Sequence, residues 1–254
     1  MSEGIKAPPP GIVWITGDGP ELREQLSPAE LERLEAFPAE KRQRDWIRGR
    51  AAAREALAQA GLECGLGEPP ALEVESDRHG APRVRCADPR WRFALSLSHG
   101  HGHALAWALP PGAGLPGVDL ELKKTRTQGT FRFYMDPTER ARVEALDPTP
   151  DARSYSPRDE AAIVVWALKE AAFKALLPPR GTGLLDVALE LEDPAHAQRG
   201  RARVSFRGGL EARAAEVGAG RVEAGWEHRG DLVLAWVHVS AAALPGIPEP
   251  LQPQ

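Results

Sequence analysis

The chain has 254 residues, of which 42% are hydrophobic, enough for one large domain or two small ones with a buried core. Its formal net charge of −4 gives no overall positive field, so we expect no nucleic-acid partner. Its two cysteines, Cys64 and Cys86, form no CxxC pair and no metal-ligand spacing, which excludes a disulfide scaffold and fits a reducing compartment.

The N-terminal stretch MSEGIKAPPPG contains no apolar segment of the kind that signal peptides have. No apolar run approaches the roughly 20 residues that a membrane-spanning helix needs. We therefore expect a soluble cytoplasmic protein with no membrane partner.

Residue patterns along the chain predict helices interspersed with short strands. The predicted helices are 27–37, 41–60, 137–146 and 158–177, and the first begins with a Ser cap followed by Pro and Glu. The predicted strands are 12–16, 72–75, 93–98, 104–109, 118–121, 187–191, 202–206 and 232–239. This order predicts an α+β fold in which antiparallel sheets lie beside helices.

A weak internal repeat runs through the chain. In each half a long predicted helix is followed, at a similar distance, by an apolar strand with a Trp, HALAWAL and LVLAWVHV. One α+β unit used twice would explain this, and so would chance recurrence in an Ala-rich chain. The join would fall in the Pro- and Gly-rich stretch 110–116, which predicts halves of 1–114 and 115–254.

The first candidate site is the strand GVDLE at residues 117–121. Side chains alternate along a strand, so Asp119 and Glu121 share one face and lie roughly 7 Å apart. Such a pair can share a hard cation such as Mg2+, which prefers oxygen ligands. The alternative is an edge strand with a solvated acidic face.

The second candidate site is on the helix that contains WALKEAAFK, residues 166–174. Glu170 and Lys174 fall on the same face as Trp166 and Phe173. An ion pair within the helix is the simple explanation, but such a pair contributes only about 0.2–0.5 kcal/mol. A metal for Glu170 and a phosphate for Lys174 would account better for charges on an apolar face.

Two further segments predict anion binding. Arg50 and Arg54 point toward the apolar side of their helix, where they match either a phosphate or a buried carboxylate. The segment SLSHGHGH places Ser98 and His99 at a strand end beside glycines, an arrangement that suits phosphate. Its alternating histidines could bind a transition metal only in an extended segment, which the glycines disfavour.

Taken in order, five motifs resemble the Sfp-type 4′-phosphopantetheinyl transferases. They are RAAAREAL at 50–57, HGAP at 79–82, SLSH at 96–99, GVDLE at 117–121 and WALKEAAFK at 166–174. The resemblance implies a pseudo-dimer of two similar α+β halves with the active site between them. It implies Mg2+-dependent transfer of the phosphopantetheine arm of coenzyme A to a serine of an apo acyl or peptidyl carrier protein, releasing adenosine 3′,5′-bisphosphate.

The resemblance also implies roles for individual residues. Asp119, Glu121 and Glu170 would hold Mg2+, and Lys174 would bind phosphate. Ser98 and His99 would meet the nucleotide phosphates, with Arg50 and Arg54 nearby. Glu139, in the segment DPTE, is the candidate proton acceptor for the carrier serine, with a first-turn helix residue as the alternative.

The chain departs from the family pattern in two places. The family usually has Gly-Lys-Pro where this chain has Gly80-Ala81-Pro82, and the stretch LLPPR precedes Gly181 where the family often has a glycine pair. These departures leave open a relative that binds coenzyme A or a carrier without turnover, and another Mg2+-dependent phosphotransferase. Since a duplicated chain could close its own cleft, we expect a monomer.

Overall fold

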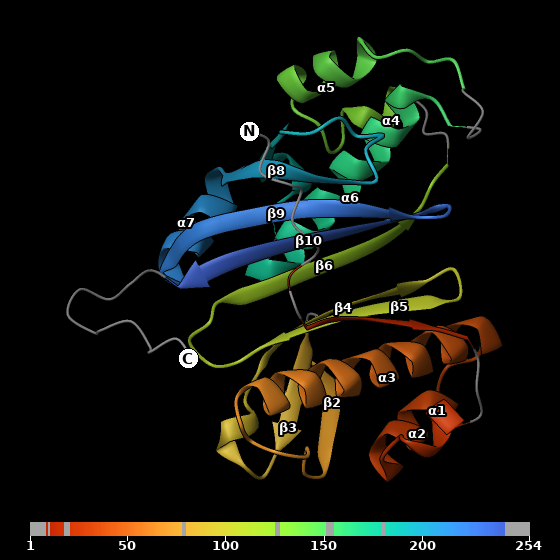
Figure 1. Cartoon of the computed structure of the whole chain (residues 1–254), viewed down its shortest axis with the longest axis vertical. Helices are drawn as coiled ribbons and strands as arrows, with labels where there is room; N and C mark the ends of the chain where they lie inside the picture. Colours follow the sequence, from red (N-terminus) through yellow and green to blue (C-terminus); the bar gives the residue numbers. More distant parts are fainter. Residues whose placement is uncertain are drawn as a thin grey trace.

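The computed structural model describes residues 9, 11–17, 21–77, 80–124, 128–150, 155–178 and 181–241. The α+β prediction is confirmed (Figure 1). The helices are α1 (Glu21–Glu24), α2 (Pro28–Glu35), α3 (Glu40–Glu63), α4 (Gln128–Phe131), α5 (Pro137–Glu144), α6 (Pro157–Leu176) and α7 (Gly208–Glu216). The strands are β1 (Ile12–Thr16), β2 (Leu72–Ser76), β3 (Pro82–Cys86), β4 (Ala94–Gly100), β5 (His103–Leu109), β6 (Leu115–Leu122), β7 (Val187–Leu191), β8 (Arg199–Phe206), β9 (Ala219–Arg229) and β10 (Leu232–Ala241).

Within the described residues, all strand pairs are antiparallel, and the strands form three sheets. The first part of the chain makes a three-stranded sheet in the order β1-β5-β4 and a separate hairpin, β2-β3. The second part makes a five-stranded sheet in the order β6-β10-β9-β8-β7. The long helix α3 packs on β4 and β5, and the long helix α6 packs on β6 and β10 (Figure 1).

Both parts of the chain follow the same order of elements. Each begins with a strand, continues through two short helices into a long helix, and then has four strands, with α7 added between β8 and β9 in the second part. In each part the first strand pairs antiparallel with the last, as β1 does with β5 and β6 with β10. This correspondence supports the interpretation that one α+β unit is used twice, while the division at residue 114 stays a prediction.

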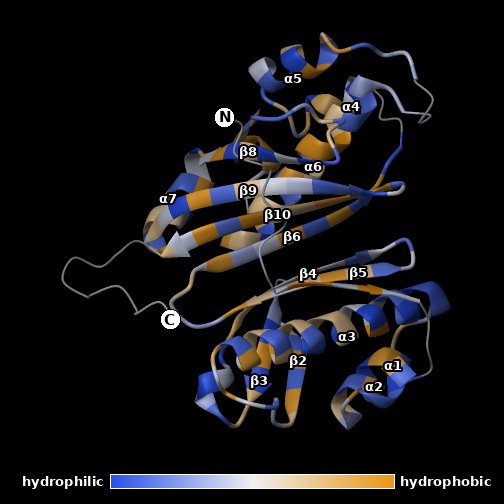
Figure 2. Cartoon of the chain, viewed as in Figure 1, coloured by the Kyte–Doolittle hydropathy of each residue, from blue (hydrophilic) through white to orange (hydrophobic). Residues whose placement is uncertain are grey.

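Three of the apolar cores formed by the described residues hold these layers together. One lies between α6 and the five-stranded sheet, and another lies between α3 and the sheet β1-β5-β4. The third joins the two halves, because Leu105 and Trp107 of β5 pack there with Val118 and Leu120 of β6 and with Leu234 of β10. Hydrophobic residues accordingly cover much of β4, β5 and β6 at the junction (Figure 2).

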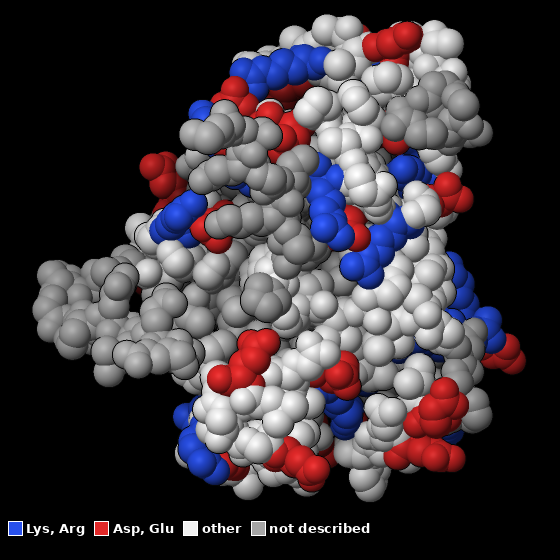
Figure 3. Space-filling model, in the orientation of Figure 1, with Lys and Arg blue, Asp and Glu red and all other residues white. Residues whose placement is uncertain are grey.

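The polar surface has mixed charge. Basic and acidic side chains are interspersed on the face shown in Figure 3. On the five-stranded sheet, Arg203 pairs with Glu190 and Glu192, and Arg221 pairs with Glu223. Among the described residues, no helix combines the length and the apolar character that crossing a membrane requires.

Candidate functional site

The site lies along the contact between strand β6 and helix α6, which approach each other very closely at Gly117. A Cβ added at Gly117 would lie 1.9 Å from the carbonyl oxygen of Ala171 and 2.9 Å from the Cβ of Ala175. Only glycine permits this separation, because any side chain would meet the backbone of the helix. The first residue of GVDLE therefore sets the distance at which the following carboxylates face the helix.

Asp119 contacts α6 directly. Its Oδ1 atom lies 2.6 Å from Nζ of Lys174 and accepts a hydrogen bond of 3.0 Å from the hydroxyl of Ser98. The side chain is buried, and its Oδ2 atom has no hydrogen-bond partner. A buried carboxylate oxygen without a donor is costly, so Oδ2 is an open acceptor in the site.

Glu121 and Lys123 continue this contact along β6. The indole Nε1 of Trp166 donates to Oε1 of Glu121 over 2.7 Å, and Lys123 lies 3.4 Å from Glu160 of α6. Together with the contact at Gly117 and the pair of Asp119 with Lys174, these pairs show that residues 117, 119 and 121 of β6 and residue 123 just beyond it face α6. We call this line of contacts the β6–α6 seam.

Glu170 is half-buried and lies on the helix between Trp166 and Lys174, four residues from each. Residues four apart on a helix share a face, so the backbone turns Glu170 toward the seam. The prediction that Glu170 and Lys174 lie on one functional face with Trp166 therefore agrees with the contacts of its two neighbours.

The carboxylates of the seam are suited to a hard cation but do not form a complete cluster. Among the described residues, no group of three or more His, Cys, Asp or Glu side chains is arranged to hold a metal ion. The ligand atoms available are nevertheless carboxylate oxygens, which Mg2+ prefers. Because Oδ2 of Asp119 is buried without a hydrogen-bond donor, a cation bound there would stabilise its negative charge. The ligand set Asp119, Glu121 and Glu170 stays a prediction.

Strand β4 is fastened to the backbone of β6 by two serine hydroxyls. Ser96 Oγ accepts from the N–H of Val118 over 3.0 Å, and Ser98 Oγ accepts from the N–H of Leu120 over 3.2 Å. Both serines are buried. The family resemblance implies that Ser98 meets a nucleotide phosphate, whereas in the structure its hydroxyl lies between the backbone of β6 and Asp119.

His99 is exposed to solvent on one side, and its ring rests on α3 at Gly49, where an added Cβ would be 2.9 Å from Cδ2. Partial desolvation by these surroundings lowers the pKa of His99 from its ordinary value, and the positive charges of Lys174 and Arg50 lower it further, against the negative charge of Asp45. His99 and Lys174 thus lie close enough to influence each other electrostatically.

Of the two partners considered for Arg54 from the sequence, a phosphate and a buried carboxylate, the structure shows the buried carboxylate. Its guanidinium makes hydrogen bonds of 3.2 and 2.5 Å to the two oxygens of Glu30. Arg50 lies 3.9 Å from the same carboxylate, stacks on the ring of Trp46 at 4.4 Å and donates to Ser76. Burial lowers the pKa of Arg50 to about 10.

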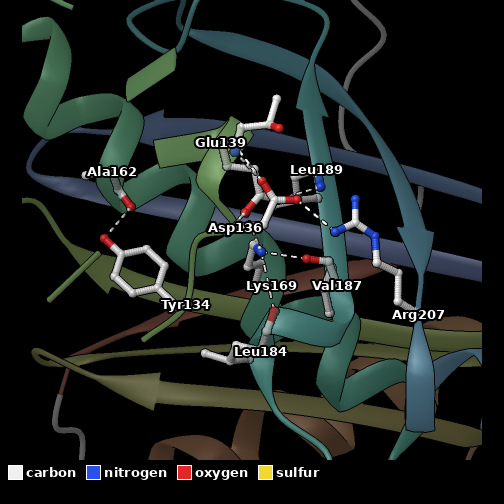
Figure 4. A network of polar contacts seen from close by, with 10 residues as sticks. Tyr134, Asp136, Glu139, Ala162, Lys169, Leu184, Val187, Leu189 and Arg207 are labelled. Atoms are coloured by element: carbon white, nitrogen blue, oxygen red, sulfur yellow. Dashed lines mark hydrogen bonds and ion pairs between the residues drawn. The ribbon is translucent and has the colours of Figure 1, made fainter. Parts of the chain in front are cut away.

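Glu139 lies in a buried network of its own (Figure 4). Its carboxylate accepts from the backbone N–H of Asp136 and of Leu189, over 2.8 and 2.7 Å, and lies 2.7 Å from Nζ of Lys169. Lys169 is fully buried and also donates to the carbonyl oxygen of Val187. Both oxygens of Glu139 are therefore engaged, in agreement with the alternative of a first-turn helix residue. Its partners come from the start of α5, from α6 and from β7, and not from β4, the strand that carries Ser98 and His99.

Gly117, Ser96 and Lys169 contribute to these arrangements but were not predicted from the sequence to do so. A glycine inside a strand is a readable signal of close approach, and it precedes the carboxylates in GVDLE. Lys169 precedes Glu170 by one residue, which turns it about 100° around the helix, away from the seam and into the core. His79 of the HGAP motif lies outside the described residues.

An α+β fold with carboxylates and a lysine along one strand–helix seam defines a candidate site for a cation and an anionic group. A family model described as ACPS, the 4′-phosphopantetheinyl transferase superfamily, matches residues 116–237, the stretch from β6 to β10 that includes the whole seam. The stretch from β6 to β10 is therefore similar to the 4′-phosphopantetheinyl transferase superfamily. No curated protein matches the chain.

Several solved structures resemble part of the chain. Holo-[acyl-carrier-protein] synthase of Thermotoga maritima has 17% identity and a TM-score of 0.38, with 51% of this chain and 64% of that chain covered. Holo-ACP-synthase of Plasmodium yoelii has 16% identity and a TM-score of 0.38, with 51% and 96% covered. The Helicobacter pylori synthase in complex with coenzyme A has 16% identity and a TM-score of 0.37, with 50% and 100% covered. Likenesses of this strength do not place individual residues.

Proposed function

We propose that this protein is an Sfp-type 4′-phosphopantetheinyl transferase, which moves the phosphopantetheine arm of coenzyme A onto a serine of an apo acyl or peptidyl carrier protein with Mg2+. The observation that carries the proposal is that the superfamily match at residues 116–237 spans both sides of the β6–α6 seam, where Asp119 and Lys174 are in contact. A fold match alone would leave the chemistry open, whereas these side chains suit a pyrophosphate substrate.

In this reaction the serine hydroxyl of the carrier attacks the phosphorus that bears the pantetheine arm. The bond from that phosphorus to the bridging oxygen breaks, and adenosine 3′,5′-bisphosphate leaves. Asp119, Glu121 and Glu170 would hold Mg2+, whose charge neutralises the pyrophosphate when it is bound. Lys174, about 30% exposed, would turn its ammonium from Asp119 toward a phosphate oxygen and stabilise the leaving group.

The serine proton must pass to an acceptor within reach. Glu139 was the candidate from the sequence, and its contacts with Lys169 and two backbone N–H groups support a structural role instead. His99 interacts electrostatically with both Lys174 and Arg50, and His99 and Arg50 would meet the nucleotide phosphates. Arg54 is held by Glu30 and would act on the nucleotide only through Arg50.

We further propose that the protein acts as a monomer in the cytoplasm. The core between its halves is built from Leu105 and Trp107 on one side and Val118, Leu120 and Leu234 on the other, all within one chain. Its two cysteines are free thiols, which suits a reducing compartment.

The test is to incubate the protein with coenzyme A, Mg2+ and a panel of apo acyl and peptidyl carriers, and to measure the intact mass of each carrier. We expect the phosphopantetheine increment on at least one carrier and a loss of roughly 100-fold or more in rate for Asp119→Asn. Glu211→Gln, an exposed change on α7, is the matched control and should leave the rate unchanged. No increment on any carrier that an established transferase does modify would refute the proposal.

A further inference from the structure

The hydroxyl of Ser98 has a single hydrogen, and the structure determines where it goes. The N–H of Leu120 can only donate, so Ser98 Oγ is the acceptor in their 3.2 Å hydrogen bond. The carboxylate of Asp119 can only accept, so the hydrogen of Ser98 points to Oδ1 across 3.0 Å. A phosphate oxygen is also an acceptor and would have to compete with Asp119 for the same hydrogen.

The donors around Asp119 are distributed unevenly between its two oxygens. Oδ1 receives both the hydroxyl of Ser98 and the ammonium of Lys174, while the buried Oδ2 has no hydrogen-bond partner. Two donors on one oxygen fix the rotation of the carboxylate about its terminal torsion, which is otherwise broad. Oδ2, the oxygen without a hydrogen-bond partner, is thereby held in one direction.

Ser98 is itself held firmly. It is 8% exposed, and its strand β4 lies beside β6 and pairs with β5, where Ser98 is opposite Leu105. Its hydroxyl also bonds the β6 backbone next to Asp119, so the donor and the carboxylate it orients cannot drift apart independently. This is the arrangement by which groups behind a metal ligand fix its orientation and tune its affinity.

We propose that Ser98 is a positioning residue for the cation site, whose hydroxyl holds Asp119 so that Oδ2 faces a divalent ion, rather than a contact for the nucleotide phosphate. The inference rests on the proposed function in taking Asp119 as a metal ligand. It assigns Ser98 a part in metal affinity that is present before coenzyme A binds.

Ser96 supplies a matched control within the same strand. It is two residues away, is also buried, and accepts from the N–H of Val118 over 3.0 Å. In the described part of the chain, this is the one hydrogen bond that its hydroxyl makes. Ser96→Ala and Ser98→Ala each leave one β6 N–H without its acceptor, so both should lower the melting temperature to a similar degree. Only Ser98→Ala also removes a donor from Asp119.

The experiment is to titrate the full chain with Mn2+, as a probe for Mg2+, without coenzyme A or carrier, and to read the affinity by calorimetry and by the Mn2+ resonance signal. Ser98→Ala should weaken Mn2+ binding roughly 10- to 100-fold, and Ser96→Ala should leave it within about twofold of wild type. Ser98→Thr keeps the hydroxyl and should restore the affinity. Ser98→Cys has a weak S–H donor and a volume similar to that of serine, so it should bind Mn2+ as weakly as Ser98→Ala. It takes the place of Ser98→Ala in the test if the alanine variant does not fold.

Equal Mn2+ affinity in the Ser96 and Ser98 variants, or a wild-type chain that binds no Mn2+, would overturn the inference. So would a Ser98→Ala variant with a raised KM for coenzyme A and an unchanged Mn2+ affinity, which would return Ser98 to the phosphate. The titration contains no substrate, so its result is independent of transfer. If the wild type transfers and Ser98→Ala binds Mn2+ with normal affinity, only this inference is contradicted. If the wild type never transfers, only the proposed function is contradicted.

Discussion

Glu30 and Glu139 occupy the same place in the two halves of the chain. Each is the third residue of a short helix, accepts from the backbone N–H of its own helix cap, accepts from the third residue of the next strand, and pairs with a cation on the following long helix. The partners are Ser27, Val74 and Arg54 for Glu30, and Asp136, Leu189 and Lys169 for Glu139. Each cation also donates to the carbonyl oxygen of the first residue of that strand, Leu72 or Val187.

The repeated network indicates that both glutamates fasten a short helix, a long helix and a hairpin together. The superfamily match and the carboxylate seam lie in the second part of the chain alone, so a contact set that recurs in the first part does not depend on that chemistry. We therefore expect Glu139→Gln to act on stability. Leaving Lys169 buried without its partner should lower the free energy of unfolding by about 3–5 kcal/mol, as measured by urea denaturation.

Transfer activity separates this role from proton abstraction. A folded Glu139→Gln protein should keep its transfer rate within about tenfold of wild type, since a general base contributes typically 10²–10⁴-fold. Glu30→Gln, the equivalent change in the other half, is the control for a purely structural loss. A decrease of 10²-fold or more in the rate of the Glu139 variant alone would restore Glu139 as the base.

Gly117→Ala tests the close approach of β6 and α6. The added Cβ would meet the carbonyl oxygen of Ala171 at 1.9 Å, so strand and helix must separate. Overpacking of a core costs about 1–3 kcal/mol and more where backbone must move, and the contact between Asp119 and Lys174 should lengthen with it. Thermal unfolding and carrier mass together should show lower stability and slower transfer.

The matched control for Gly117 is Gly129 of α4, where an added Cβ has no neighbour within 4 Å. Gly129→Ala should be neutral or stabilise the protein by about 0.4–1 kcal/mol, because alanine loses less backbone entropy on folding. A Gly117→Ala protein as stable and as active as the Gly129 variant would show that the seam tolerates a wider separation.

Arg54→Met should destabilise the protein without changing its affinity for coenzyme A. Arg54 makes two hydrogen bonds to the buried carboxylate of Glu30, whose loss leaves that charge without its nearest partner. The free energy of unfolding should fall by about 3 kcal/mol or more, and Glu30→Gln in the same chain should recover part of it. A large rise in the dissociation constant for coenzyme A, measured by calorimetry on folded protein, would instead favour direct contact with the nucleotide.

Local sequence patterns predicted the long elements because those patterns need no tertiary information. The predicted helix 158–177 and the strand 232–239 match α6 and β10 closely. Strand β9 was missed because its residues are polar and it contains Gly225, which lies against the backbone of Gly200 and the ring of Trp236. Helix α7 and strand β3 were missed for similar reasons, since Gly208 and Pro82 at their starts are typical of turns.

Partners across the fold were harder to predict than elements. The capping patterns SPAE at 27–30 and DPTE at 136–139 are both readable in the sequence, and their similarity was the available sign that Glu30 and Glu139 are equivalent. The contact of Lys174 with Asp119 depends instead on the position of β6 along α6. Gly117 fixes that position through its close approach to the backbone of α6. Sequence alone gives the residue types of the site but not this register.

Stability should fall as the pH is lowered through the range just below 6.5, in part because of His99. Its pKa in the folded protein is lowered from its ordinary value of 6.5 by partial desolvation and by the positive charges of Lys174 and Arg50, with the negative charge of Asp45 opposing. The unfolded chain therefore takes up a proton at a higher pH than the folded chain does. Between these two pKa values the unfolded state binds more protons, so acid favours unfolding there, and the full contribution of neutral His99 is present above 6.5.

The measurement is the free energy of unfolding in urea between pH 7.5 and 5.5, a range that limits protonation of ordinary carboxylates. His99→Gln removes one titrating group and should give a shallower loss of stability than wild type over this range. His103, whose pKa is lowered by burial and by the charges of Arg48 and His101, should contribute in the same direction, so His103→Gln should flatten the profile further. Equal slopes for wild type and His99→Gln would show that desolvation and the charges of Lys174 and Arg50 do not lower the pKa of His99 in the folded protein.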